Sequence, residues 1–369
     1  MAAAELISRF DALLADLDGV VYAGPQAIPG AVESLRRLAG IGVGLGYVTN
    51  NASRSPAEVA QHLRELGAPA EEQQVMSSPQ AAGELLASQL PPGARVLITG
   101  ATGFVGRAVA AQLRGRGLDL RAVVRRGAEF DLKTGDEVVE TDDLFTESAD
   151  WWAEHCAGVD MVVHVAWYAE PGKYLTSDRN LDCLSGTVAL ARGAARAGVR
   201  RFVGVGTCFE YDLSGGRLSP QTPLDPLTPY AAAKASTFLT LNQWLPVQGV
   251  EFLWARLFYL YGAGEDPRRL VPYLHQQMQA GARADLTSGT QIRDFMDVED
   301  AAAMLVDDAL SARTGASNIA SGTGITVRAL AERIADQYGR RDLLNFGARP
   351  DNLTDPPCVI GLRDKEATT

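Results

Sequence analysis

The chain has 369 residues, of which 46% are hydrophobic and 21% are charged, and these values predict a folded protein of two units, each large enough for its own core. The net charge of −11 argues against nucleic acid or an anionic membrane as a partner, no stretch reaches the ~20 apolar residues of a membrane span, and the N-terminus lacks the basic residues of a signal peptide. Because the four cysteines form no Cys-x-x-Cys pair and no metal-binding spacing, we expect reduced thiols, no zinc site and a cytoplasmic location.

Residues 1–93 are predicted to form a small strand-helix unit. Its first strand, rich in leucine and alanine, ends in Asp16 and Asp18, and side chains two apart on a strand share a face. A carboxylate pair of this kind can hold Mg²⁺ while one carboxylate attacks a phosphoryl group. A second strand ends in Thr49 and Asn50, which offer a hydroxyl and an amide. The alternative is an ordinary turn after a strand.

This unit resembles the N-terminal part of haloacid-dehalogenase-like phosphatases, in the branch that acts on glycerol phosphate and nitrophenyl phosphate. The resemblance implies that Asp16 is the nucleophile, Asp18 the acid/base and Thr49 the phosphate holder. The family also needs a downstream Lys and a later Gly-Asp pair. No Lys precedes Lys133, and Leu362 stands where the first Asp of the later site is expected. We therefore expect Asp16 and Asp18 to bind Mg²⁺ weakly and to hydrolyse esters poorly.

The most informative motif follows an apolar strand over residues 95–99 and is rich in glycine. Gly100 allows a tight turn, Gly103 lets the backbone approach a pyrophosphate, and Gly106 lets the next helix pack closely. The N-terminus of that helix offers free N–H groups to phosphate. The motif predicts a dinucleotide site formed by Gly100, Thr102, Gly103, Phe104, Val105 and Gly106.

The next two predicted strands indicate which dinucleotide is bound. The strand over residues 120–124 ends in Arg125 and Arg126. A NAD site usually has a carboxylate here to hold the ribose hydroxyl, whereas an Arg accommodates a 2′-phosphate, so we expect NADP(H) to be preferred over NAD(H). Two solvated arginines are the alternative. Asp143 and Leu144, which follow the third strand, are placed to meet the adenine.

Tyr230 and Lys234 lie four apart on a predicted helix and therefore share a face. A free Tyr has a pKa near 10, too high for efficient acid/base chemistry at neutral pH, and a neighbouring ammonium lowers the pKa of the phenol. The chain has only four lysines, which makes a chance occurrence of this spacing less frequent. Thr207, at the end of the strand over residues 202–206, is expected to supply a hydroxyl partner.

From about residue 95 onward, the chain resembles the extended short-chain dehydrogenase/reductase family, in the branch of nucleotide-sugar epimerases, dehydratases and 4-ketoreductases. The stretch covers about three quarters of the chain, and its motifs occur in the family's order. They are Thr99–Gly106, Val163–Ala166, Thr207, Tyr230 with Lys234, Arg256–Gly262 and Arg293–Asp300.

The resemblance implies a role for each matching residue. Tyr230 is the general acid/base, Lys234 anchors the ribose and Thr207 orients the carbonyl. Arg293 is expected to hold the substrate diphosphate, to which a guanidinium fork is suited, together with Tyr259, which replaces the usual Asn. Ala166 belongs to the cofactor site.

One departure from the family pattern bears on the reaction. The dehydratases carry Asp-Glu directly after the Thr, and here those positions hold Cys208 and Phe209. Glu210 comes one position later, and a slip of one residue on a strand turns the side chain to the other face. Elimination of water is therefore not expected.

The fold predicted for residues 94–261 is a doubly wound parallel α/β sheet of the Rossmann type, with residues 262–369 forming a mixed α/β substrate lobe, for which truncation is one interpretation. Because residues 95–99 suit both families, the chain is interpreted as a fusion or chimera joined at a shared strand. We expect a reductase or epimerase acting at C4 of a nucleotide-activated (deoxy)sugar, and a homodimer is one expected assembly. The alternatives are a Mg²⁺-dependent phosphatase and a non-catalytic NADP-binding fusion protein.

Overall fold

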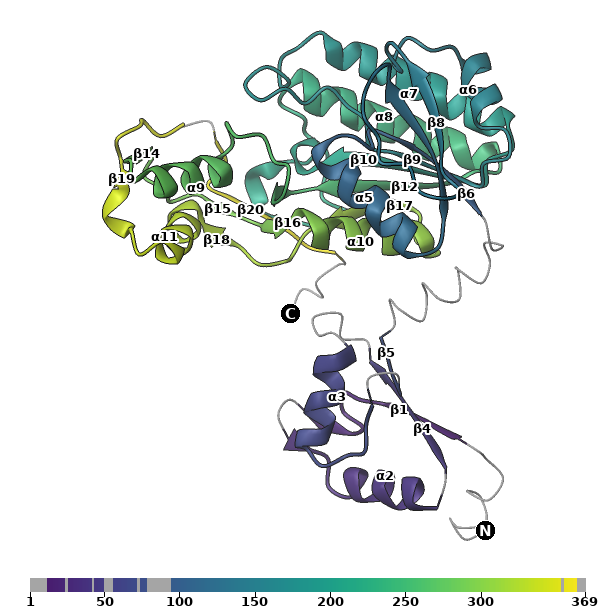
Figure 1. Ribbon diagram of the computed structural model, residues 1–369, viewed down its shortest axis with the longest axis vertical. Coiled ribbons are helices and arrows are strands. Elements are labelled where there is room, and N and C mark those ends of the chain that lie inside the picture. The colour runs from purple at the N-terminus through teal and green to yellow at the C-terminus, as the bar shows by residue number, and fades with distance from the viewer. Residues whose placement is uncertain are drawn as a thin grey trace. The chain divides into compact units, whose positions relative to one another are not determined.

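The computed structural model describes residues 12–23, 26–41, 43–49, 56–71, 74–77, 94–352 and 355–363. The chain divides into two compact units (Figure 1). One unit lies before residue 90, and the other contains the remaining residues apart from Leu310–Ala312. Each unit has its own core and is described separately.

The N-terminal unit is built on a parallel sheet in the order β1-β4-β5. Asp16 pairs in register with Val48, so the ends of β1 and β4 lie at the same edge of the sheet. Leu17, Tyr47 and Leu63 are fully buried in its core. The elements are β1 (Ala12–Asp16), β2 (Tyr22–Ala23), β3 (Gln26–Ala27), α2 (Ala31–Gly40), β4 (Gly44–Thr49), α3 (Pro56–Glu65) and β5 (Val75–Ser77).

The larger unit contains a seven-stranded sheet in the order β17-β12-β10-β9-β6-β7-β8, with every neighbouring pair parallel. This confirms the predicted doubly wound sheet. Its strands are β6 (Arg95–Thr99), β7 (Asp119–Arg125), β8 (Glu137–Thr141), β9 (Met161–His164), β10 (Arg201–Thr207), β12 (Glu251–Leu257) and β17 (Gly315–Ile319). Its helices are α5 (Phe104–Gly115), α6 (Ala149–His155), α7 (Arg179–Arg196), α8 (Pro229–Val247) and α10 (Val298–Leu310).

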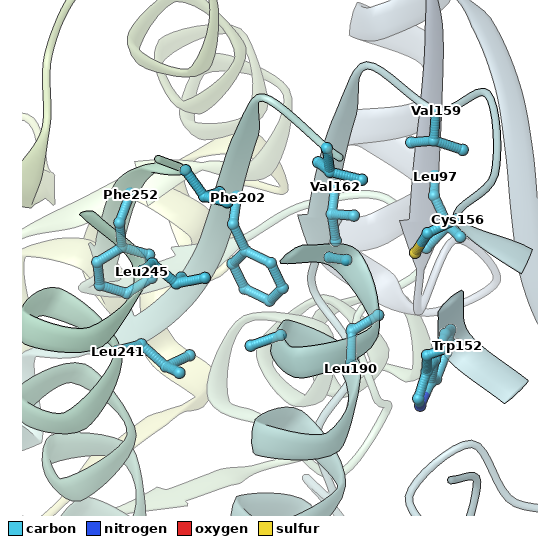
Figure 2. Close-up of a cluster of buried hydrophobic side chains, with 14 of the residues drawn as sticks. Leu97, Trp152, Cys156, Val159, Val162, Leu190, Phe202, Leu241, Leu245 and Phe252 are labelled. Carbon is cyan, nitrogen blue, oxygen red and sulfur yellow. The ribbon is translucent and has the colours of Figure 1, made fainter. Parts of the chain in front are cut away.

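Helices cover both faces of this sheet. Trp152 of α6, Leu190 of α7 and Leu241 of α8 pack in one buried cluster with side chains of the central strands (Figure 2). On the other face, Arg116 at the end of α5 pairs with Asp307 of α10. Burial on both faces explains why the strands are almost continuously apolar.

A smaller lobe completes this unit around Leu274 and Ile334, which are buried. It contains a sheet in the order β11-β20-β15-β18 and the pairs β13-β16 and β14-β19. Its elements are β11 (Arg217–Leu218), β13 (Tyr259–Tyr261), α9 (Leu270–Ala280), β14 (Ala284–Leu286), β15 (Ile292–Arg293), β16 (Phe295–Asp297), β18 (Ile325–Thr326), α11 (Val327–Gln337), β19 (Leu344–Phe346) and β20 (Cys358–Gly361), with short 3₁₀ turns η2 (Cys208–Glu210), η3 (Leu213–Gly215) and η4 (Arg341–Leu343).

The lobe differs from the expected segment 262–369 in two respects. Strands β11 and β13 of the lobe come before residue 262. Helix α10 and strand β17 lie after residue 261 but belong to the large sheet, where β17 pairs with β12. Strand β20 pairs with β11 and β15, so the residues next to Leu362 serve this unit rather than the N-terminal one. Within the described parts of the chain, no helix is long and apolar enough to cross a membrane.

Candidate active site

A cavity of about 940 Å³ opens at the carboxyl edge of the large sheet, and both the strand ends and the lobe line it. Strands β6 and β9 are neighbours at this edge, and the chain continues from them toward opposite sides of the sheet. Parallel α/β sheets bind ligands at such a point, because the loops there diverge and leave a crevice. The cavity therefore lies where the topology predicts a binding site.

The glycine-rich turn after β6 forms the floor of the cavity. Gly100 has a φ of +74°, and a Cβ placed there would lie 2.7 Å from the Ala166 nitrogen. A Cβ at Gly106 would lie 1.9 Å from the Gly100 oxygen. Helix α5 begins after Gly103 with no side-chain cap and no acidic residue in its first turn, so its N–H groups are available to an anion. This turn fits the pyrophosphate of a dinucleotide.

The strand ends carry the other residues expected to hold a dinucleotide. Arg125, the last residue of β7, lines the cavity. Arg126 is absent from the lining, and its exposed side chain donates to Asp142 at 2.8 Å instead. Twelve of the thirteen predicted cofactor residues line this one cavity, namely Gly100, Thr102, Gly103, Phe104, Val105, Gly106, Arg125, Asp143, Leu144, Ala166, Tyr230 and Lys234.

Asp143 is held in place by a residue that sequence reasoning missed. Arg179, from the start of α7, donates to an Asp143 oxygen at 2.6 Å, and the Phe145 amide donates to the other oxygen at 3.1 Å. Burial acts to raise the pKa of Asp143, but these two hydrogen bonds outweigh it and the pKa is lowered. Asp143 is therefore a fixed carboxylate beside the cavity.

Thr207, Tyr230 and Lys234 all line the cavity, as expected. Helix α8 begins with Thr228 as its cap, whose hydroxyl accepts from Ala231 at 3.2 Å, and Pro229 follows in the first turn. This start places Tyr230 in the first turn and Lys234 one turn later on the same face.

The surroundings of Tyr230 contradict one expectation. Burial raises the pKa of Tyr230, the nearby Tyr174 adds to the rise, and a hydrogen bond with Thr207 opposes it. The Tyr174 ring lies edge-on at 4.8 Å between centroids. The predicted lowering of this pKa by Lys234 is wrong for this structure, because burial dominates and the ammonium is bonded elsewhere.

The Lys234 ammonium points at strand β10. Its Nζ atom donates to the Val205 carbonyl at 2.5 Å and lies 3.8 Å from the centroid of the Trp167 ring. Burial lowers the pKa of Lys234 to about 7, and Glu210 and Cys183 oppose that lowering. Lys234 is therefore close to its titration point at neutral pH.

The substrate side contains Arg293 and Tyr259. Arg293 is 3% exposed, donates to Asp355 at 2.6 Å and lies 5.3 Å from the centroid of the Tyr259 ring. The Tyr259 hydroxyl is buried without a hydrogen-bond partner among the described residues. Arg293 is therefore partly satisfied by Asp355, while Tyr259 presents a free hydroxyl in the cavity wall.

The two positions after Thr207 are apolar in the cavity. Cys208 and Phe209 line it, and Glu210 does not. We expected Glu210 to turn away because of a one-residue slip on a strand, but the chain here forms the 3₁₀ turn η2. The carboxylate instead points into the protein and pairs with Arg256 at 2.7 Å. The absence of Glu210 from the lining was predicted for the wrong geometric reason.

Residues 96–318, more than half of the chain, match the model of the NAD dependent epimerase/dehydratase family. The chain belongs to this family. Residues 13–114 match the model of haloacid dehalogenase-like hydrolases. The two matches overlap at 96–114, where strand β6 and helix α5 lie, in keeping with a fusion joined at a shared strand.

The individual relatives also match one unit or the other. A dTDP-6-deoxy-L-talose 4-dehydrogenase (NAD(+)) from Aggregatibacter actinomycetemcomitans is 22% identical over 271 residues, covering 73% of this chain and 99% of the relative. A D-glycerol 3-phosphate phosphatase from Mycobacterium tuberculosis is 50% identical over 109 residues, 30% of each chain. The chain thus spans less than a third of that phosphatase.

Solved structures of nucleotide-sugar enzymes share the fold of the larger unit. A UDP-N-acetylglucosamine 4-epimerase from Methanobrevibacter ruminantium has a TM-score of 0.64 at 19% identity, covering 74% of this chain and 90% of its own. A UDP-glucose 4-epimerase from Thermotoga maritima has a TM-score of 0.63 at 20% identity, covering 73% and 90%. At these identities the likeness establishes the fold.

The epimerase/dehydratase cavity also contains a carboxyl group that no sequence signal marked. Glu265 follows β13 in a charged segment that reads as a solvated loop, yet its Oε2 atom is buried without a hydrogen-bond partner among the described residues. Burial raises the pKa of Glu265 to about 7, against the opposing effect of Arg269. Arg269 also bonds to Tyr174, which connects this segment to the surroundings of Tyr230.

The hydrolase-like unit places its predicted residues at one edge of its sheet. Asp16 and Asp18 are exposed, and Asp16 accepts from its neighbour Leu17 at 2.9 Å. Thr49 is buried at the end of β4, and Asn50 lies outside the described residues. In the described part of the chain, no group of three or more His, Cys, Asp or Glu side chains could hold a metal ion.

Proposed function

We propose that the larger unit is an oxidoreductase or epimerase that acts at C4 of a nucleotide-activated deoxysugar and prefers NADP(H). The observation that carries this proposal is the convergence of Thr207, Tyr230 and Lys234 with the glycine-rich turn in one cavity. A proton donor and a dinucleotide site that face the same space are what hydride transfer to or from a carbonyl requires.

The residues fit a nicotinamide dinucleotide, which supplies or accepts a hydride when bound. The free N–H groups at the start of α5 would hold the pyrophosphate. Arg125 would hold the 2′-phosphate, since a guanidinium lines the cavity at the end of β7. Asp143 and Leu144 would border the adenine.

Tyr230 would move the proton at the sugar oxygen. Its raised pKa keeps the hydroxyl protonated at neutral pH, so in a reduction it can donate to the ketone oxygen. Thr207, hydrogen-bonded to Tyr230, would orient that oxygen. In an epimerisation the same residues serve the oxidation first and the reduction afterwards.

The cavity wall favours a substrate that loses no water. Cys208 and Phe209 lie beside Thr207, and burial raises the pKa of the Cys208 thiol to about 12, so neither supplies the acid/base pair that elimination needs. Apolar side chains here also suit a deoxygenated sugar carbon. Reductase and epimerase are separated by cofactor use: a reductase consumes NADPH stoichiometrically, whereas an epimerase interconverts two sugars without net consumption.

The proposal is tested by thermal unfolding with NADPH, with NADH and with neither. A ligand at 100 times its Kd adds about 2.7 kcal/mol of stability, a shift of several degrees for a unit of this size. We expect a larger shift with NADPH than with NADH. No shift with either cofactor would refute the proposed dinucleotide site.

A second candidate is phosphate-ester hydrolysis by the N-terminal unit, favoured by its 50% identity to a D-glycerol 3-phosphate phosphatase over 109 residues. The test is release of phosphate from glycerol 3-phosphate by the parent and by Asp16→Asn. Equal, background rates from the two proteins would count against this second activity. Phosphate release that Asp16→Asn abolishes would establish this second activity.

A further inference from the structure

Glu210 is a fully buried carboxylate directly behind the proposed catalytic residues. One of its oxygens accepts from the Thr207 amide at 2.8 Å, and the other accepts from Arg256 at 2.7 Å. The indole N–H of Trp254 donates to both oxygens, at 3.0 and 3.1 Å. Glu210 thus connects the end of β10 to strand β12 through three donors.

The space for this carboxylate is created by glycine. A Cβ at Gly206 would lie 2.4 Å from Glu210 Oε1 and 2.2 Å from Trp254 Nε1, and a Cβ at Gly204 would lie 2.4 Å from the Trp254 ring. Any side chain at either position would therefore displace the indole or the carboxylate. The glycines at positions 204 and 206 of β10 therefore leave room for Trp254 and for the Glu210 carboxylate, which accepts a hydrogen bond from the Thr207 amide.

Glu210 also faces Lys234. Trp254 contacts both residues, since its indole donates to Glu210 while its ring centroid lies 5.7 Å from Lys234 Nζ. Lys234 donates to Val205, two residues before the Thr207 whose amide Glu210 holds. The two side chains therefore bond to the same short stretch of β10, at Val205 and Thr207.

The other titratable groups around this pair carry no compensating negative charge. Cys183 of α7 faces Lys234, but burial raises the pKa of its thiol, which therefore stays protonated. His164 of β9 faces Lys234 and is neutral, because burial lowers its pKa to about 3. Around Glu210 itself stand Arg256, Tyr211, Tyr230 and Cys208, of which Arg256 carries a charge. Glu210 is the anion that stabilises the ammonium.

We propose that Glu210 is a positioning residue of this active site, which fixes the Thr207 backbone and favours the ammonium form of Lys234. This inference rests on the proposed function for its catalytic consequence. Glu210 touches neither substrate nor cofactor, since it is absent from the cavity lining. A purely structural ion pair with Arg256 would stabilise the fold without affecting Lys234, and this difference can be measured.

The experiment compares Arg256→Met with the double variant Glu210→Gln/Arg256→Met. Both lack the guanidinium, and only the first retains the carboxylate. Glu210→Gln alone leaves a buried guanidinium without its partner, and Arg256→Met leaves a buried carboxylate without one, whereas replacing both members of a buried pair is often tolerated. Thermal unfolding first confirms that both variants fold.

Lys234 is then titrated by NMR on protein carrying ¹³Cε-lysine. The chain has only four lysines, so the spectrum is simple, and Lys234→Arg assigns the signal. Removing a nearby opposite charge shifts a pKa, by about one unit or more at close range. We expect the pKa of Lys234 to be lower by about that amount in the double variant than in Arg256→Met. Equal pKa values in the two variants would overturn the proposal.

Turnover supplies the second readout. The fall of kcat at high pH should begin about one unit lower in the double variant, with KM changed less than kcat. An unshifted kcat profile in a variant whose Lys234 pKa has moved would overturn the catalytic part. If the parent turns over no nucleotide sugar, the proposed function fails, while the NMR titration still decides what Glu210 does to Lys234.

A second variant covers the case in which the double variant does not fold. Glu210→Asp keeps the charge beside Arg256 but shortens the side chain by one methylene. Withdrawing the carboxylate by one methylene should alter the titration of Lys234 and release the Thr207 amide. An unchanged Lys234 titration together with an unchanged kcat profile would overturn the proposal.

Discussion

Replacing Gly106 by Ala should distort the glycine-rich turn, because the added Cβ would overlap the backbone of Gly100. A Cβ at this position would lie 1.9 Å from the oxygen and 2.6 Å from the carbonyl carbon of Gly100. Both atoms belong to the backbone, so neither can rotate away, and α5 must move away from β6 by more than an ångström. Overpacking of this kind costs about 1–3 kcal/mol.

Gly115 provides the matched control, because it lies at the other end of α5 and a Cβ there would meet nothing within 4 Å. Gly115→Ala should raise stability slightly, since Ala is favoured over Gly in a helix by about 0.5–1 kcal/mol. Each kcal/mol corresponds to about 2–4 °C in Tm for a domain of 150–250 residues.

The assay is thermal unfolding of both variants, with and without NADPH. Gly106→Ala should unfold several degrees below Gly115→Ala, and the stabilisation by NADPH should be smaller or absent. Equal Tm values and equal NADPH shifts would refute both the close packing of the turn and its role in holding the cofactor.

Three further predictions concern charge. Burial lowers the pKa of His164 to about 3 in the folded protein, so below about pH 6.5 the unfolded chain binds more protons than the folded one. The free energy of unfolding should therefore fall as the pH drops from about 6.5, by about 2 kcal/mol at pH 5. Urea unfolding of His164→Gln should lack this pH-dependent contribution. Arg125→Ala should lower the affinity for NADPH about tenfold or more in titration calorimetry and leave the affinity for NADH unchanged. Because Arg126 pairs with Asp142 outside the cavity, Arg126→Ala should leave both affinities unchanged. The raised pKa of Glu265, about 7, means that stability is lost as pH rises from about 4.5 through 7, so Glu265→Gln should be more stable than the parent at pH 8 by about 1–2 kcal/mol in urea unfolding.

The parts of the site that sequence predicted are those encoded over short distances. The turn from Gly100 to Gly106 is a continuous motif whose glycines each have a local backbone reason. Tyr230 and Lys234 are one helical turn apart, so their common face follows from periodicity. Thr207 could be placed because a strand end is recognisable from the apolar run before it. All three elements line the same cavity.

What sequence could not predict depends on contacts between distant segments. The hydrogen bond from Lys234 to Val205, and the burial that raises the pKa of Tyr230, require knowledge of how α8 packs on β10. The burial of Glu265 arises where the lobe meets the large sheet, and its segment reads as an ordinary polar loop. The return of β17 to the sheet depends on tertiary pairing with β12.

The two arginines at the end of β7 also show that sequence alone could not assign every side chain to the site. Arg125 and Arg126 are adjacent in sequence, and residue type alone assigns both to the cofactor. In the structure one side chain lines the cavity and the other pairs with Asp142 in solvent. Successive side chains at a strand end point in opposite directions, so only the register of β7 can decide between them.

The most direct test of the proposed function is turnover of a 4-keto-6-deoxy nucleotide sugar with NADPH by the parent, Tyr230→Phe and Tyr338→Phe. Tyr338 caps α11, bonds to His275 at 2.9 Å and does not line the cavity, so its loss should leave turnover unchanged. Loss of NADPH absorbance, or conversion to the 4-epimer without such loss, reports the reaction. If Tyr230 is the proton donor, Tyr230→Phe should be slower by about 10²–10⁴-fold. Turnover by Tyr230→Phe at the parental rate would contradict the central claim.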